Sequence, residues 1–109
     1  QYRRQLPAGV SPIVERDLGH VYHLFPVRLR DRDRLSAHLA REGIGTLIHY
    51  PVPLSAQPAF AAYEPAECPI ASAASAELLS LPLHPRLTDA DVAHVARQVS
   101  AFVKGPLPA

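Results

Sequence analysis

Apolar and polar residues alternate from His20 to Leu29, and this period of two residues predicts a β-strand. One face of the strand carries the residues that would point into the core: Val21, His23, Phe25, Val27 and Leu29. This placement makes His23 a core histidine. The opposite face carries Tyr22 and Leu24, large side chains that we expect to remain uncovered, as at an interface.

Two other segments have the helical period of 3.6 residues. The first runs from about Arg32 to Glu42, where Leu35 and Leu39 share a stripe and Gly43 would form a left-handed cap. The second follows the capping-box sequence Thr88–Asp91. Its apolar stripe consists of Val92, Val95, Ala96, Val99, Phe102 and Val103.

Three shorter elements complete the pattern. Residues 44–50 predict a second strand, which Pro51 would end because proline donates no ladder hydrogen bond. Residues 51–69 contain five prolines and predict an irregular loop with a helical turn near its middle. Pro69 would open an Ala-rich helix, and the alternating leucines of residues 79–83 predict a short extended edge.

This order of elements predicts an α+β domain with a small mixed sheet of about three strands. Helices would cover one face of the sheet and leave the other for a partner domain. Residues 1–6 contain good helix formers but no preceding capping residue, so we interpret them as the end of an inter-domain helix. Residues 7–104 would form one small domain, and residues 105–109 a flexible tail.

Composition and charge exclude several classes of protein. The 109 residues are 48% hydrophobic and 19% charged, which is typical of a globular chain. A net charge of +1 does not favour nucleic acid or membrane surfaces, and no apolar run approaches the roughly 18 residues of a membrane helix. The single Cys68 cannot form an internal disulfide, which favours a reducing cytoplasm.

Two groups of polar side chains, a histidine pair and a run of arginines, can be explained without a functional site. His20 and His23 would lie on opposite faces of a strand, so no metal site is expected. The four arginines within residues 28–34 alternate with Asp31 and Asp33, as on a solvated edge. An anion contact, with a pyrophosphate group or a partner subunit, is the alternative for these arginines.

The best candidate for a binding site is His49-Tyr50-Pro51. Two polar aromatic side chains at a strand end, before a loop fixed by prolines, suit the rim of a pocket. We therefore predict His49 and Tyr50 as substrate-binding residues, although Tyr50 could equally cover the core while His49 binds the backbone. His23 is the third candidate, beside its interpretation as a core residue.

Several short motifs occur in the order found in one enzyme family. Together they resemble the C-terminal domain of the DegT/StrS-type sugar aminotransferases. The motifs are Tyr22-His23-Leu24, the Arg-Asp-rich helix start, Gly43-Ile44-Gly45-Thr46, His49-Tyr50-Pro51, Leu79-Ser80-Leu81-Pro82 and Thr88-Asp89-Ala90-Asp91. The resemblance covers nearly the whole chain, from Gln1 to about Val103.

The resemblance implies a fold-type-I transaminase that uses pyridoxal 5'-phosphate. Such an enzyme is a homodimer, and its N-terminal large domain supplies the Schiff-base lysine. The small domain closes the cleft where an amino acid donates its amino group to a keto-sugar nucleotide or related cyclic ketone. The only lysine here is Lys104, near the tail, so we expect neither a catalytic nor a cofactor-binding residue in these 109 residues, which would be inactive alone.

Two alternatives remain open. One is a non-catalytic module, derived from this domain, that binds a ligand or a partner. The other is part of a pyridoxamine-dependent sugar dehydratase, in which the lysine is replaced. The chain also departs from many family members at Ser55, where they carry a further histidine, and this difference is compatible with a different substrate.

Overall fold

The computed structural model describes residues 1–105; of the predicted tail, residues 106–109 lie outside the described part. The helices and strands follow in the order α1 (Tyr2–Gln5), β1 (Ser11–Pro12), β2 (Phe25–Arg28), α2 (Arg32–Arg41), η1 (Leu54–Ala56), η2 (Pro58–Tyr63), α3 (Pro69–Glu77), β3 (Leu78–Leu81) and α4 (Asp89–Lys104). The elements η1 and η2 are 3-10 helices.

The three strands form a sheet in the order β1-β2-β3, and both pairs are antiparallel. This architecture confirms the α+β class with a small sheet. The sheet is not mixed, however, because its named strands contain no parallel pair. In the β2–β3 register Val27 lies opposite Leu79 and Pro26 lies opposite Ser80. Alternate residues therefore point to opposite faces of the sheet.

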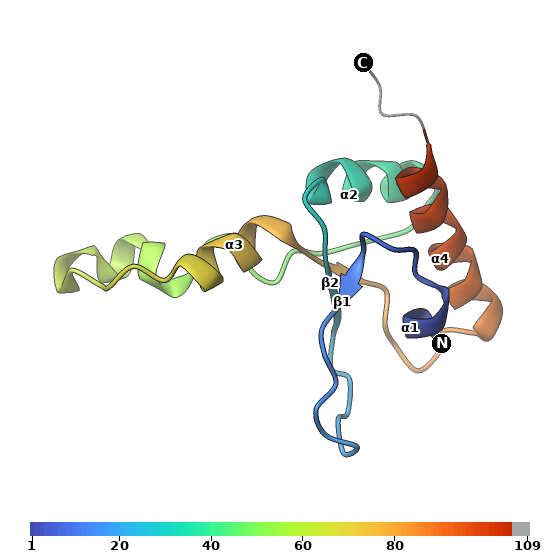
Figure 1. The fold of residues 1–109 in the computed structure, drawn as a ribbon, viewed down its shortest axis with the longest axis horizontal. Helices are drawn as coiled ribbons and strands as arrows, with labels where there is room; N and C mark the ends of the chain where they lie inside the picture. Colours follow the sequence, from blue (N-terminus) through green and yellow to red (C-terminus); the bar gives the residue numbers. More distant parts are fainter. Residues whose placement is uncertain (106–109) are drawn as a thin grey trace.

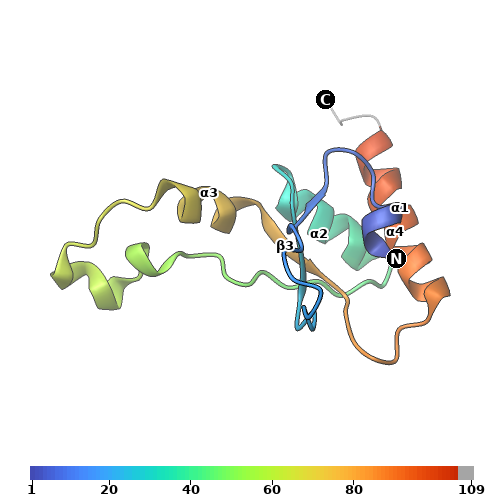
Figure 2. The same ribbon diagram turned by 60° about the horizontal axis from the view of Figure 1, so that its bottom comes forward.

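The helices α1, α2 and α4 lie on one side of the sheet, as predicted (Figure 2). The core lies between them and the sheet, and α1 and α2 both pack on α4. Its largest fully buried side chains are Val27, Leu35, Leu39, Leu79 and Val99. These residues come from β2, α2, β3 and α4, so long-range packing stabilises the domain.

Local signals define the ends of the two longer helices. Gly43 follows α2 with a φ of +74°, a conformation that glycine adopts without a steric penalty. At the start of α4 the Thr88 side chain accepts a hydrogen bond from the Asp91 backbone, and the Asp91 carboxylate accepts one from the Thr88 backbone. No helix within residues 1–105 is long and apolar enough to cross a membrane.

Two segments extend away from the core (Figure 1). Residues 13–24 form one, which we call the hairpin arm, and residues 51–77 form the other, which we call the helical arm. They give the chain extents of 48 × 44 × 23 Å and a radius of gyration of 15.5 Å. A compact domain of this length would have a radius of gyration of about 13 Å. The helical arm contains η1, η2 and α3 and leaves the sheet on the side opposite the helices (Figure 2).

The strand predicted from His20 to Leu29 is shorter than expected, since β2 begins only at Phe25. Its N-terminal half belongs to the hairpin arm, where Tyr22 has a φ of +50° that interrupts extended backbone. Val21 is consequently 89% exposed and His23 is exposed, so the interpretation of His23 as a core residue is wrong. Tyr22 and Leu24 are half-buried rather than uncovered.

The strand predicted over residues 44–50 is mostly irregular, and only Leu47 pairs, through an isolated bridge to Ser80. The third strand is instead β1, whose Ser11 and Pro12 pair with β2. The loop predicted over residues 51–69 contains η1 and η2 and is followed by α3, which begins at Pro69 as predicted. Hydrogen-bonded pairing between segments far apart in the sequence determined which extended segments became strands.

Tyr2 connects α1 to the rest of the domain. Its side chain is only 4% exposed, its ring lies 5.0 Å from that of Phe25, and its hydroxyl donates a 3.0 Å hydrogen bond to the Pro82 carbonyl. Burial, and secondarily the charge of Asp91, raise the pKa of Tyr2 from 10.0 to about 12. The folded state therefore favours the neutral phenol.

This pKa shift predicts a loss of stability at alkaline pH. The contribution of Tyr2 is fully present below pH 10 and is lost as the pH rises to about 12, because only the unfolded chain ionises in that window. The loss is up to about 2–3 kcal/mol in the free energy of unfolding. Chemical denaturation between pH 8 and pH 12 measures it. Tyr2→Phe should flatten this dependence, whereas the exposed control Tyr63→Phe should keep it.

Candidate functional site

The bridge between Leu47 and Ser80 brings the predicted site to the edge of the sheet. The Ser80 backbone N–H donates to the Leu47 carbonyl over 2.8 Å, and the Leu47 N–H donates to the Ser80 carbonyl over 3.3 Å. Two residues beyond Leu47, the Nδ1 atom of His49 lies 2.9 Å from the Ser80 hydroxyl. The bridge and this hydrogen bond together fix the His49 ring against β3.

Ser80 is the partner that the sequence analysis did not identify. Its neighbours Leu79 and Leu81 point toward the helices, so Ser80 points to the opposite face, yet it is only 6% exposed. A buried hydroxyl needs a hydrogen-bond partner, and His49 supplies one. A single serine within the apolar run Leu78–Leu81 was the available signal, but its partner lies 31 residues away in the sequence.

A hollow of about 350 Å3 lies beside this pair. Its walls come from the segment after α2, from β3 and from the chain that follows β3: Leu24, Gly45, Thr46, Leu47, His49, Ser80, Leu81, Pro82 and Leu83. Leu47 is 66% exposed, which is unusual for a leucine beside a buried polar pair. The site therefore combines an uncovered apolar surface with an imidazole in a fixed orientation.

The chemistry of His49 follows from its partner. When Nδ1 accepts a hydrogen bond from the Ser80 hydroxyl, the neutral ring carries its proton on Nε2, which can donate a hydrogen bond to a ligand oxygen. Protonation of the ring makes both nitrogens donors and adds a positive charge. His49 is thus suited to hold a carbonyl, phosphate or carboxylate oxygen.

Tyr50 stands beside His49 but does not line the hollow. Its side chain is 71% exposed, and its ring stands edge-on to the His49 ring at 5.5 Å. The alternative that Tyr50 covers the core is therefore wrong. The assignment of His49 and Tyr50 as substrate-binding residues stays a prediction.

His23 does not join them. It lies on the hairpin arm and lines a different hollow, of about 220 Å3, with Arg3, His20 and Tyr22. Within residues 1–105 no group of three or more His, Cys, Asp or Glu side chains could hold a metal ion.

Comparison with known proteins finds a family match over most of the chain. Residues 2–100 match the sequence profile described as the DegT/DnrJ/EryC1/StrS aminotransferase family. The chain belongs to this family. The chain is similar to a dTDP-3-amino-3,4,6-trideoxy-alpha-D-glucose transaminase of Streptomyces venezuelae, 44% identical over 84 residues, which cover 75% of this chain and 22% of that protein.

A second family member, a dTDP-3-amino-3,6-dideoxy-alpha-D-galactopyranose transaminase of Aneurinibacillus thermoaerophilus, is 36% identical over 91 residues. Those residues cover 84% of this chain and 25% of that protein. The crystal structure of Streptomyces venezuelae DesV in complex with a ketimine intermediate superposes with a TM-score of 0.82 and 37% identity, covering 94% of this chain and 29% of DesV. The chain thus spans about a quarter of the length of its DegT/DnrJ/EryC1/StrS relatives.

Pyridoxal phosphate, the cofactor implied for the family, requires a lysine whose amine is desolvated. Lys104 is exposed in the last turn of α4 and does not line the hollow beside His49. Its position does not fit a Schiff base. We therefore derive no catalytic step through the cofactor from these residues.

Proposed function

We propose that this chain is the C-terminal small domain of a pyridoxal-phosphate-dependent sugar aminotransferase. The amino acceptor would be a keto-sugar nucleotide or a related cyclic ketone, and the donor an amino acid such as glutamate. The observation that carries the proposal is the His49–Ser80 pair beside an open hollow, within the residues matched to the aminotransferase family. In this proposal the chain positions substrate and does not form the covalent bond to it.

His49 would bind the keto-sugar or the donor carboxylate. Its Nδ1 is engaged by Ser80, so Nε2 would donate a hydrogen bond, or the protonated ring would supply a local charge. Tyr50 would contact the substrate beside His49, and His23, which lines the separate hollow on the hairpin arm, would contact another part of it. A hydrogen-bond donor in a fixed orientation lowers the ordering cost of binding.

The uncovered surface near this site supports a partner domain. Leu47, Tyr50, Val52 and Leu54 are 66%, 71%, 41% and 75% exposed, and they follow one another from the sheet edge into the helical arm. Exposed apolar groups in such proximity typically mark interfaces. We propose that the large domain of the same enzyme covers them, and that the complete enzyme is a homodimer in the cytoplasm.

One test uses the 109-residue chain itself. Incubation with pyridoxal phosphate followed by borohydride should give no stoichiometric reduced adduct at a defined residue, because the Lys104 amine is exposed to water. Mass spectrometry of the digested chain checks this prediction. A stoichiometric adduct on Lys104 together with transaminase turnover would contradict the assignment of the lysine to another domain.

The decisive experiment uses the complete polypeptide that contains this chain. We expect a visible absorbance band of bound pyridoxal phosphate and transfer of an amino group from glutamate to a keto-sugar nucleotide. A complete polypeptide that binds no cofactor would instead support the non-catalytic module. Cofactor binding with sugar dehydration and without amino transfer would support the dehydratase.

A further inference from the structure

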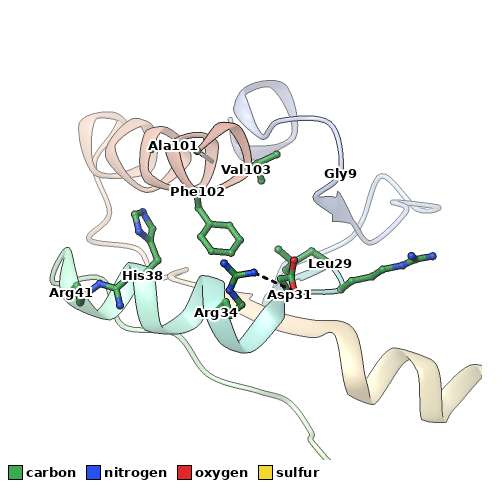
Figure 3. Close-up of a pocket in the computed structure, with 11 residues that line it drawn as sticks. Gly9, Leu29, Asp31, Arg34, His38, Arg41, Ala101, Phe102 and Val103 are labelled. Atoms are coloured by element: carbon green, nitrogen blue, oxygen red, sulfur yellow. Dashed lines mark ion pairs between the residues drawn. The ribbon is translucent and has the colours of Figure 1, made fainter. Parts of the chain in front are cut away.

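A third hollow lies between α2 and the C-terminal end of α4, with a volume of about 660 Å3 (Figure 3). We call it the α2–α4 cleft. Ser80 and His49 do not line it, since the helices lie on the opposite side of the sheet from the Ser80 side chain. Its volume is within the range of small-molecule binding sites, roughly 300–1,000 Å3.

The α2 side of the cleft is strongly basic. Arg34, His38 and Arg41 are four and three residues apart and therefore lie along one face of the helix (Figure 3). Arg30 also lines the cleft, and the one acidic lining residue is Asp31, whose carboxylate is 4.0 Å from Arg34. Within residues 1–105, neither Arg30 nor Arg41 forms an ion pair. The residues that line the cleft therefore carry a net positive charge even when His38 is counted as neutral.

The α4 side of the cleft is apolar and centres on Phe102. The Arg34 guanidinium lies over the Phe102 ring, with Cζ 6.0 Å from its centroid, and the His38 ring is 5.7 Å from the same centroid. Phe102 therefore helps to hold both basic side chains in place. The Nε2 atom of His38 is buried and has no hydrogen-bond partner among residues 1–105. This atom is shielded from solvent, so the His38 ring would have to turn toward the cleft to donate to a bound oxyanion.

We propose that the α2–α4 cleft binds a diphosphate group of a small molecule. Arg34 and Arg41 are seven residues apart, which corresponds to about 10 Å along the helix axis. The two arginines therefore project from separate turns of α2, and two linked phosphates would let each guanidinium bind a phosphate of its own. Each guanidinium can donate two parallel hydrogen bonds to phosphate oxygens. The inference rests on the cleft alone and does not depend on the proposed aminotransferase function.

Titration of the isotope-labelled 109-residue chain with inorganic pyrophosphate at constant ionic strength tests the inference. NMR should show saturable binding of one pyrophosphate, weaker binding of orthophosphate, and shifts concentrated in residues 34–41 and 101–105. Arg34→Gln and Arg41→Gln should each weaken pyrophosphate binding about tenfold, equivalent to about 1.4 kcal/mol. Arg97→Gln removes the same charge from the exposed surface of α4 outside the cleft and should change the affinity little.

Three results would overturn the inference. The first is the absence of saturable pyrophosphate binding to the unsubstituted chain. The second is an equal loss of affinity in Arg97→Gln, which would indicate unspecific attraction by net charge. The third is a set of shifts centred on His49 and Ser80, which would place the anion in the proposed substrate site instead. The unsubstituted chain and all three arginine variants are checked by thermal unfolding before titration, so that each result is read from folded protein.

Discussion

Leu79→Ala is expected to lower the free energy of unfolding by about 2–5 kcal/mol. Leu79 is fully buried in β3, lies opposite Val27 of β2, and faces the helices that cover the sheet. Its truncation removes apolar contacts and leaves a cavity that a well-packed core fills only partly. A small domain has a total stability of only about 5–15 kcal/mol, so this variant should unfold at a much lower denaturant concentration.

The matched control for this change is Leu54→Ala. Leu54 is the same residue type, but it lies on the helical arm and is 75% exposed, so its truncation should change stability by less than about 0.5 kcal/mol. Urea denaturation followed by circular dichroism compares the two variants directly. Similar losses for Leu79→Ala and Leu54→Ala would mean that the sheet–helix core assigned here does not dominate stability.

His49→Ala is expected to reduce the activity of the complete enzyme by about one to two orders of magnitude, equivalent to about 1.4–2.8 kcal/mol of transition-state stabilisation. The proposed role is hydrogen bonding to the substrate, so the loss should appear in the Michaelis constant or in turnover. Folding should remain nearly intact. His49 is only half-buried, and its removal leaves the Ser80 hydroxyl unpaired at a cost of about 1 kcal/mol.

Two further variants separate a site effect from a structural one. Ser80→Ala keeps the imidazole but removes the hydrogen bond that orients it, so it should retain more activity than His49→Ala. His84→Ala removes an exposed histidine that does not line the hollow beside His49 and should retain full activity. If His49→Ala were fully active in a folded enzyme, the proposed binding role of His49 would be wrong.

The exposed position of His23 changes the effect on stability that we expect from replacing it. A core histidine would lower the melting temperature when replaced by Ala, but His23 is exposed on the hairpin arm, so His23→Ala should leave stability unchanged. The alternation from His20 to Leu29 predicted the correct face for Phe25 and Val27. It failed for Val21 and His23 because the left-handed backbone at Tyr22 ends the extended run before β2 begins.

The candidate site was predictable only in part. His49 and Tyr50 were accessible to sequence reasoning because two polar aromatic residues stand directly before a proline-rich loop. Ser80 was not, since its importance depends on a hydrogen bond to His49 across 31 residues. A serine within an apolar strand becomes informative only after the fold shows that its side chain is buried and which group satisfies it.

Local sequence features specify the helices α2 and α4, together with the C-terminal end of α2 and the N-terminal end of α4. Helical period, a capping box at Thr88 and a left-handed glycine at Gly43 are local features that act within a few residues. Long-range packing, in contrast, placed β1 rather than residues 44–50 in the sheet and paired Leu47 with Ser80. Strand pairing joins segments far apart in the sequence, so its free energy depends on which surfaces the folded chain brings together.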